Sequence, residues 1–207
     1  MSGAEIIARR SPKCDQVLKG ARKVFMERGY EGASVDEIAR AAGTSKATLY
    51  SYFPDKRQLF EAVMQSEVDR TGEVMRGGEG PEPVEDVLRR MAESFATFLF
   101  SPAAQEMFRV CIGEAGRFPE LGAAFHASGI ARARGQLIAF FEAAAARGEL
   151  AIDDPETAAD QFGALCKSGL FMRALLGAPR PADAEIRTVA DEAVRTFLAR
   201  YGAAARP

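Results

Sequence analysis

The chain has 207 residues, of which 47% are hydrophobic, so it can bury a substantial core and is expected to be globular. Its formal net charge is -2, which excludes a protein that binds nucleic acid through a uniformly positive surface. Residues 1–60 nevertheless hold eleven Lys and Arg against seven Asp and Glu, whereas the remainder hold sixteen against twenty-two. The N-terminal part is therefore the basic part of the chain.

Targeting and metal-binding signals are missing from the sequence. The first residues, "MSGAEIIARR", lack the apolar region of a signal peptide, and no stretch approaches the roughly 18 unbroken apolar residues of a membrane span. Cys14, Cys111 and Cys166 are widely spaced and follow neither a disulfide framework nor a zinc-ligand pattern. We therefore expect a cytoplasmic protein with no membrane association, metal or other cofactor.

The first elements in chain order are helical. Apolar residues recur at helical spacing almost everywhere, and no alternating run followed by a hairpin signal indicates a strand, so we expect an all-α fold. A first helix is expected at about residues 14–28, closed by the glycines of "RGYEG". A second begins at Ser34, because "SVDE" places Glu37 three residues later and predicts a capping box.

The third helix is short and polar, and it lies within "AAGTSKATLYSYFPDK". Gly43 ends the helix before it, and Thr44 or Ser45 caps the new one. A proline stops the third helix after Phe53, and a fourth helix follows at about residues 55–76.

The rest of the chain is expected to be a set of longer helices. "RGGEGPEP", residues 76–83, predicts a loop because it holds three Gly and two Pro. Further helices are expected at about residues 84–100, 102–115, 119–147 (which can kink near Gly129), 155–176 and 183–201. The last two are the most apolar. The residues expected to share one apolar face of the first of these two are Phe162, Leu165, Cys166, Gly169 and Met172.

Two short helices joined by "AAGT", with a third helix beneath them, are the parts of a helix-turn-helix. Leu49 and Phe53 lie four residues apart, so both can face the core. Ser45 and Lys46, together with the free amides at the start of the helix, can meet phosphates, and Thr48 is short enough to approach a base edge. We expect this helix to contact DNA, although a solvated surface helix would carry similar side chains.

The segment "LKGARKVFMERGYEGASVDEIARAAGTSKATLYSYFPDKRQLFEAVM", residues 18–64, closely resembles the DNA-binding domain of the TetR/AcrR transcriptional repressors. The resemblance implies a three-helix helix-turn-helix domain at residues 1–56 and a helical effector-binding and dimerisation domain at residues 57–207, with a connecting helix at about 55–76. Many relatives have Gly where this chain has Ala47. The DNA contacts carried over position by position are Ser34, Thr44, Ser45, Lys46, Ala47, Thr48, Tyr50, Tyr52 and Lys56.

The remaining chain resembles, more loosely, the AefR-like type of C-terminal domain in the same family. The segments "GEAGRFPELGAAFHASG" and "ARGELAIDDPETAADQFGAL" carry this similarity. It implies a variable effector pocket and a homodimer formed by residues 155–176 and 183–201 as a four-helix bundle. The apolar faces expected on these two helices agree with that arrangement.

An effector pocket would draw on the aromatic residues of the C-terminal part. Eleven of the fourteen Phe follow residue 65, and although most must fill the core, a ligand site between helices is lined by the same side chains. His126 is the only histidine and can serve as a polar pocket residue. The candidate pocket residues are Phe95, Phe98, Phe108, Cys111, Phe125, His126, Phe141, Phe162 and Cys166.

The leading hypothesis is a transcriptional repressor that binds a pseudo-palindromic operator in double-stranded DNA as a homodimer and is released by a small hydrophobic effector. A transcriptional activator or an effector-free DNA-binding protein would use the same contacts. An enzyme is disfavoured, because the chain has no recognisable nucleophile and base, phosphate loop or paired carboxylates. Arg9, Arg10 and Lys13 could form an arm in the minor groove or remain solvated charge.

Overall fold

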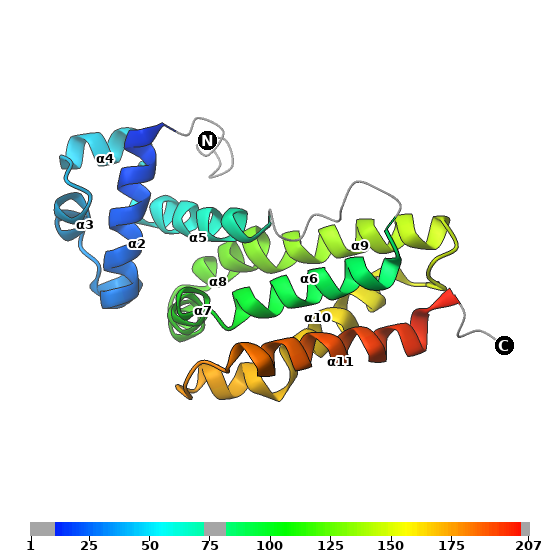
Figure 1. Ribbon diagram of the computed structural model, residues 1–207. Helices are drawn as coiled ribbons and strands as arrows, with labels where there is room; N and C mark the ends of the chain where they lie inside the picture. The colour runs from blue at the N-terminus through cyan, green and yellow to red at the C-terminus, as the bar shows by residue number, and fades with distance from the viewer. Residues whose placement is uncertain (1–10, 73–81, 204–207) are drawn as a thin grey trace. The chain divides into compact units, whose positions relative to one another are not determined.

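The computed structural model describes residues 11–72 and 82–203. Within these ranges the chain forms α-helices and one π-helical turn but no strand, as Figure 1 shows, so the all-α prediction is confirmed. Arg9, Arg10 and most of the expected loop at residues 76–83 lie outside the described ranges. The elements are α2 (Pro12–Gly32), α3 (Val35–Ala41), α4 (Lys46–Tyr52), α5 (Lys56–Gly72), α6 (Val84–Leu99), α7 (Pro102–Ala115), α8 (Pro119–Phe125), η1 (His126–Ile130), α9 (Ala131–Ala146), α10 (Pro155–Leu175) and α11 (Asp183–Tyr201).

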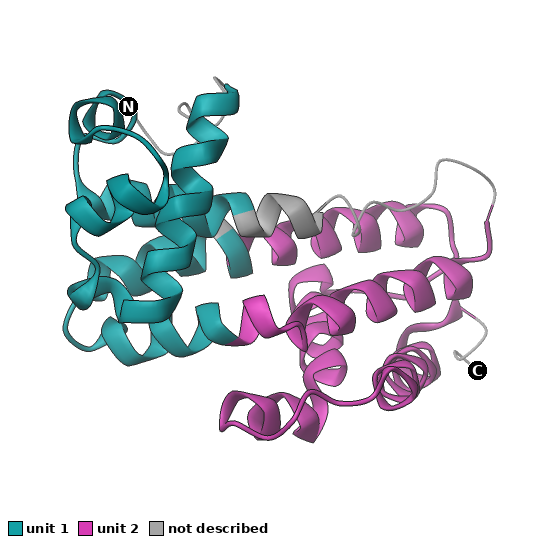
Figure 2. Ribbon diagram, turned by 60° about the vertical axis from the view of Figure 1, so that its left-hand side comes forward, with its two compact units in different colours: residues 1–70, 106–130 teal, residues 71–105, 131–207 magenta. Residues whose placement is uncertain are grey.

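The chain divides into two compact units, coloured separately in Figure 2. Unit 1 comprises residues 1–70 and 106–130, and unit 2 comprises residues 71–105 and 131–207. Unit 1 therefore joins the helix-turn-helix segment to a stretch that follows it by more than forty residues. The domain division expected at residue 56 stays a prediction.

In unit 1, α2 packs against α3 and supplies a large part of the apolar core. Ser11 caps α2, since its Oγ accepts a hydrogen bond from the amide of Cys14 at 3.2 Å. Gly20 allows α3 to approach closely, because a Cβ at this position would lie 2.5 Å from the backbone nitrogen of Ala42. The buried residues of α2 are Cys14, Val17, Leu18, Gly20, Ala21, Val24, Phe25 and Tyr30.

The first helix is longer than expected but interrupted. It runs to Gly32, with a non-helical backbone at Gly29 (φ 72°, ψ 176°). This break inserts Tyr30 among other aromatic rings, with its centroid 5.3 Å from that of Phe60 and 5.2 Å from that of Phe118. The π-helical turn η1 contains Gly129, near which the sequence predicted a kink.

Unit 2 has an aromatic core. Helix α6 packs against α10 and α11, and α10 also packs against α9. The ring of Phe197 lies 4.9 Å from Phe141 and 5.1 Å from Phe162, measured between centroids, and all three side chains are buried. These contacts hold the three C-terminal helices together.

One expected helix face is wrong in its second half. Phe162 and Cys166 of α10 are buried, but Gly169 is exposed and the Met172 side chain is 53% exposed. The reason is a break at Ser168 (φ 44°, ψ -168°), which turns the following residues away from the direction that uniform helical periodicity would give. Leu170 and Phe171 then pack on a smaller cluster formed by Ala96, Phe100, Ala174 and Ile186.

Candidate nucleic-acid interface

The N-terminus of α3 is fixed by the capping box that the sequence predicted. Ser34 Oγ accepts a hydrogen bond from the amide of Glu37 at 3.2 Å, and Glu37 Oε2 accepts one from the amide of Ser34 at 3.3 Å. The hydrogen bond to Ser34 holds the pKa of the Glu37 carboxyl below its ordinary value. Ser34 remains exposed at this corner, and its role as a phosphate contact stays a prediction.

The turn between α3 and α4 is held by a residue that sequence reasoning missed. Gly43 adopts φ 57°, which an L side chain rarely adopts, and the amide of Thr44 donates to the carbonyl of Ala39 at 3.0 Å. Gln16 of α2 donates from Nε2 to the carbonyl of Ala42 at 2.6 Å. No local sequence pattern predicts this contact, because Gln16 and Ala42 are 26 positions apart.

Helix α4 has one buried and one exposed side, and the two buried residues are those that the sequence predicted. Leu49 and the capping residue Phe53 are fully buried, whereas Ala47 and Tyr50 are exposed. Ser45 caps the helix, since its Oγ accepts from the amide of Thr48 at 3.1 Å. The Thr48 hydroxyl also hydrogen-bonds to the Ser45 hydroxyl, with 2.8 Å between the two oxygens. The exposed side is therefore polar and conformationally fixed.

Lys46 opens α4 and carries the exposed positive charge of this helix. Its Nζ lies 2.7 Å from Oδ1 of Asp36, which is in the first turn of α3. Both side chains are more than half exposed, so water screens the pair. The ammonium predicted to meet a phosphate therefore already has a carboxylate partner within the protein.

Tyr52 and Lys56, two of the predicted DNA contacts, each have a polar contact with another residue of the chain. The hydroxyl of Tyr52 lies 3.3 Å from Oγ of Ser11, which ties the end of α4 to the start of α2. Lys56 donates from Nζ to the carbonyl of Ala33 at 3.1 Å, and its Nζ lies 4.6 Å from the ring centroid of Tyr30. Lys56 thus secures the end of α2, which sequence reasoning did not anticipate, and its phosphate contact stays a prediction.

The candidate pocket residues are distributed over both units. In unit 1, the rings of Phe108 and Phe125 meet edge to face at 5.2 Å, and His126 is exposed at the start of η1. In unit 2, Phe141 and Phe162 belong to the closed aromatic core. The remaining four are Phe95 and Phe98, which are half-buried, and Cys111 and Cys166, which are buried. The set as a whole stays a prediction.

Burial keeps the thiols of Cys111 and Cys166 protonated. Burial raises the pKa of Cys111 and that of Cys166 to about 12. The Cys111 thiol faces the sulfur of Met64 at 3.8 Å. Since the thiolate is the reactive form, both side chains act here as apolar packing groups.

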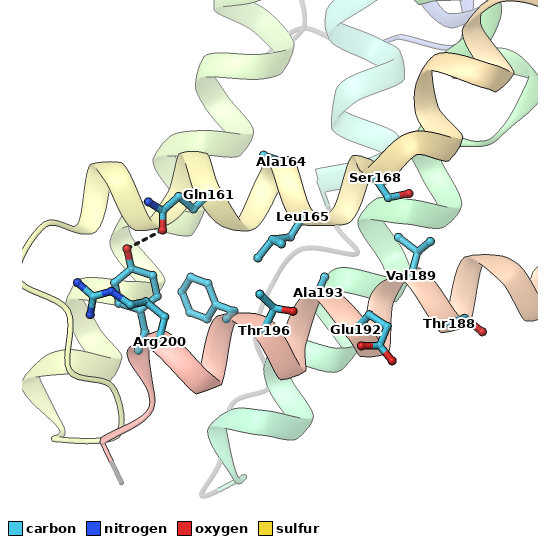
Figure 3. A pocket seen from close by; sticks show the side chains of 12 residues that line it. Gln161, Ala164, Leu165, Ser168, Thr188, Val189, Glu192, Ala193, Thr196 and Arg200 are labelled. Carbon is cyan, nitrogen blue, oxygen red and sulfur yellow. Dashed lines mark hydrogen bonds between the residues drawn. The ribbon is translucent and has the colours of Figure 1, made fainter. Parts of the chain in front are cut away.

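A groove runs along α10 and α11 within unit 2, as Figure 3 shows. It has a volume of about 710 Å³ and is lined mainly by apolar and small side chains. At one end the hydroxyl of Tyr201 donates to Oε1 of Gln161 at 2.8 Å. The lining residues are Gln161, Ala164, Leu165, Ser168, Thr188, Val189, Glu192, Ala193, Thr196, Phe197, Arg200 and Tyr201.

The described residues contain neither a helix that could span a membrane nor a metal-binding cluster. No helix in ranges 11–72 and 82–203 combines the length and apolar character needed to cross a bilayer. Among the same residues, no group of three or more His, Cys, Asp or Glu is arranged to hold a metal ion.

Two family models match the chain. Residues 17–63 match the model of bacterial regulatory proteins of the tetR family, and residues 86–203 match that of the AefR-like transcriptional repressor C-terminal domain. The second match covers more than half of the chain, and the first includes all of α3 and α4.

Individual relatives agree with these models. The solved structure of the flavonoid-responsive regulator FrrA is 32% identical, has a TM-score of 0.78, and matches over 92% of this chain and 97% of its own. The transcriptional activator FasR of Mycolicibacterium smegmatis is 47% identical over 29% of this chain and 27% of its own length. The transcriptional repressor AcnR of Corynebacterium diphtheriae is 34% identical over 42% of this chain and 44% of its own. Both curated relatives are therefore matched over less than half of their length.

Proposed function

Since the chain belongs to the TetR family, whose members are bacterial transcriptional regulators and not enzymes, we propose that it is a cytoplasmic, ligand-responsive repressor. In this proposal a homodimer binds a pseudo-palindromic operator, and a small hydrophobic effector releases it. Two recognition helices would then enter successive major grooves about 34–36 Å apart.

The observation that carries the proposal is the two-sided construction of α4. Leu49 and Phe53 anchor the helix in the core, while Lys46, Ala47 and Tyr50 are exposed on a segment whose two ends are fixed by Ser45 and Tyr52. A rigid exposed helix suits base reading, because the side chains then need little ordering when DNA binds. We propose that all nine predicted contact residues, from Ser34 to Lys56, contact DNA on and around this helix.

Selection of bound sequences from random duplex DNA at fixed salt tests this assignment. A palindromic consensus is expected, and Lys46→Ala and Tyr52→Ala should both weaken its binding. Lys46→Ala should also reduce the slope of log affinity against log salt by about 1 if the ammonium contacts a phosphate. Arg109→Ala removes an exposed charge from α7, outside the proposed DNA contacts and dimer interface, and should leave binding unchanged. Failure to enrich any sequence would contradict the proposal.

The groove on α10 and α11 supports dimerisation through residues 155–176 and 183–201. Small side chains such as Ala164 and Ala193 line it, so helices of a second copy could approach closely. An apolar, concave face of this kind is typical of an interface that another protein surface covers.

Charge placed in the groove should separate the protomers. Ala164→Arg is expected to convert the dimer to a monomer in sedimentation velocity, because the long charged side chain would occupy the space between the two copies and would lose its hydration there. Ala139→Arg adds the same side chain to an exposed position of α9, outside the proposed interface, and should leave the dimer intact. A monomeric wild-type protein would contradict this part of the proposal.

The effector is proposed to be apolar and aromatic. The candidate pocket residues are mainly Phe, and FrrA, which is similar over nearly its whole length, is named as flavonoid-responsive. A panel of flavonoids is therefore the first set to test for release of the protein from its selected DNA. Linkage requires that DNA weaken flavonoid binding by the same factor, so a one-sided effect would contradict the model.

Gln105 is a candidate polar anchor for such a ligand. Its side chain is 5% exposed, and its Nε2 donates to the carbonyl of Leu99 at 2.6 Å. Its Oε1 accepts no hydrogen bond from any described residue. A buried acceptor without a partner is unfavourable, so a ligand hydroxyl that donated to it would gain affinity. Gln105→Leu should weaken binding of a hydroxylated flavonoid while the protein stays folded.

Activation of transcription is the second candidate function. FasR, which is 47% identical to this chain over 60 residues, is a transcriptional activator. The same DNA contacts serve both outcomes, and only the position of the operator relative to the promoter separates them. In vitro transcription from a promoter that carries the selected site would decide between repression and activation.

A further inference from the structure

An ion pair between Asp36 and Lys46 joins the two short helices of unit 1. The Lys46 ammonium lies 2.7 Å from the Asp36 carboxylate, and the two residues come from different helices of the helix-turn-helix. We propose that Asp36 competes with DNA phosphate for Lys46 and thereby weakens binding to every duplex, whatever its sequence. This inference rests on the proposed DNA-binding function.

The positions of the two charges on their helices favour competition. Asp36 lies in the first turn of α3, where a negative charge is stabilised by the helix dipole. Lys46 is the first residue of α4, where a positive charge is disfavoured by the dipole of its own helix. The carboxylate of Asp36 therefore provides the counter-charge for Lys46 that a solvent ion or a phosphate would otherwise provide.

A phosphate can approach Lys46 only at a cost. The ammonium has three N–H donors, so it could bond to a carboxylate and a phosphate together. Two anions at one ammonium repel each other, and if Lys46 instead leaves Asp36, the attraction seen at 2.7 Å is lost. Either route weakens the contact with DNA, and because phosphates carry no sequence information, the effect is uniform over sequences.

Asp36→Asn tests the competition, because asparagine keeps the shape of the side chain and removes its charge. Fluorescence anisotropy at fixed salt would compare binding to the selected consensus duplex and to a random duplex of equal length. Asp36→Asn is expected to tighten both by the same factor, roughly two- to fivefold, which is the range for an exposed ion pair. The ratio of the two affinities should not change.

Two further variants separate the pair from a general charge effect. Glu27→Gln removes one negative charge from an exposed position of α2 in the same unit and should have little effect. In a Lys46→Gln background, Asp36→Asn should produce no gain, because the contested ammonium is gone. A gain that persists there would overturn the proposal by showing that Asp36 repels DNA directly. A gain limited to the consensus duplex would overturn it in favour of base reading.

The outcomes also distinguish this inference from the function on which it rests. If the wild-type protein binds neither duplex at low salt, the DNA-binding proposal fails and the competition fails with it. If the wild type binds and Asp36→Asn binds with equal affinity, only the competition is overturned. Circular dichroism of Asp36→Asn should match the wild type, since the capping box at Ser34 and Glu37 does not use Asp36.

Discussion

Two helices of this protein are interrupted, one in each compact unit, and nearly the same backbone conformation interrupts both. Helix α2 of unit 1 breaks at Gly29 (φ 72°, ψ 176°), and α10 of unit 2 breaks at Ser168 (φ 44°, ψ -168°). Glycine adopts a positive φ without steric cost, whereas serine does not. The first break is therefore encoded locally, and the second must be imposed by its surroundings.

The neighbours of each break explain why it persists. After Gly29, Tyr30 is buried among aromatic rings and beneath the ammonium of Lys56. After Ser168, Leu170 and Phe171 pack against the second cluster of unit 2, and Oγ of Ser168 accepts a hydrogen bond from the amide of Leu170 at 3.3 Å. Packing thus compensates for strain at a residue that a sequence pattern would place inside a continuous helix.

The largest effect is expected from removing the glycine that unit 1 uses. Gly29→Ala should lower the free energy of unfolding by about 1–3 kcal/mol, because alanine is strained at this φ. Its Cβ would also lie 3.1 Å from Oε1 of Glu114. Chemical denaturation would measure the change. As a control, Gly32→Ala places its Cβ in ordinary contact with Arg28 and should change the free energy by less than about 0.5 kcal/mol. Equal effects would contradict the comparison.

The opposite substitution in unit 2 should be stabilising. Ser168→Gly is expected to raise the free energy of unfolding by about 1 kcal/mol, since relief of strain exceeds the extra entropy of the unfolded chain. Ala139→Gly, at an exposed interior position of α9, should instead lower it by about 1 kcal/mol. Denaturation at equal protein concentrations would compare the two variants. Destabilisation by both would mean that Ser168 is not strained.

The smallest effect concerns the start of the interrupted helix in unit 2. Asp154 caps α10, and the hydrogen bond from the Thr157 hydroxyl, at 2.6 Å, lowers the pKa of its carboxyl below the ordinary 3.8. A depressed pKa contributes stability above the unfolded value, and this contribution is lost as the pH falls through the folded value. Asp154→Asn should therefore flatten the acid limb of the stability profile measured by denaturation between pH 2 and pH 6. An unchanged acid limb would show that the cap has no role in acid sensitivity.

Much of unit 1 could be predicted because its signals are local. A capping box needs only Ser34 and Glu37, and a left-handed turn needs only Gly43, so short patterns located α3 and α4. The four-residue spacing of Leu49 and Phe53 likewise identified the buried side of α4. The all-α class followed from periodicity that is repeated along the chain.

The sequence by itself therefore determined most of the helices, the capping box at Ser34 and the exposed polar helix, because these depend on interactions among residues at most a few positions apart. Only the tertiary structure decided that Asp36 holds Lys46, that Gln16 holds the turn at Ala42, and that Ser168 breaks α10. These features depend on which helices pack together. Packing joins residues distant in the sequence, so no local pattern carries its signal.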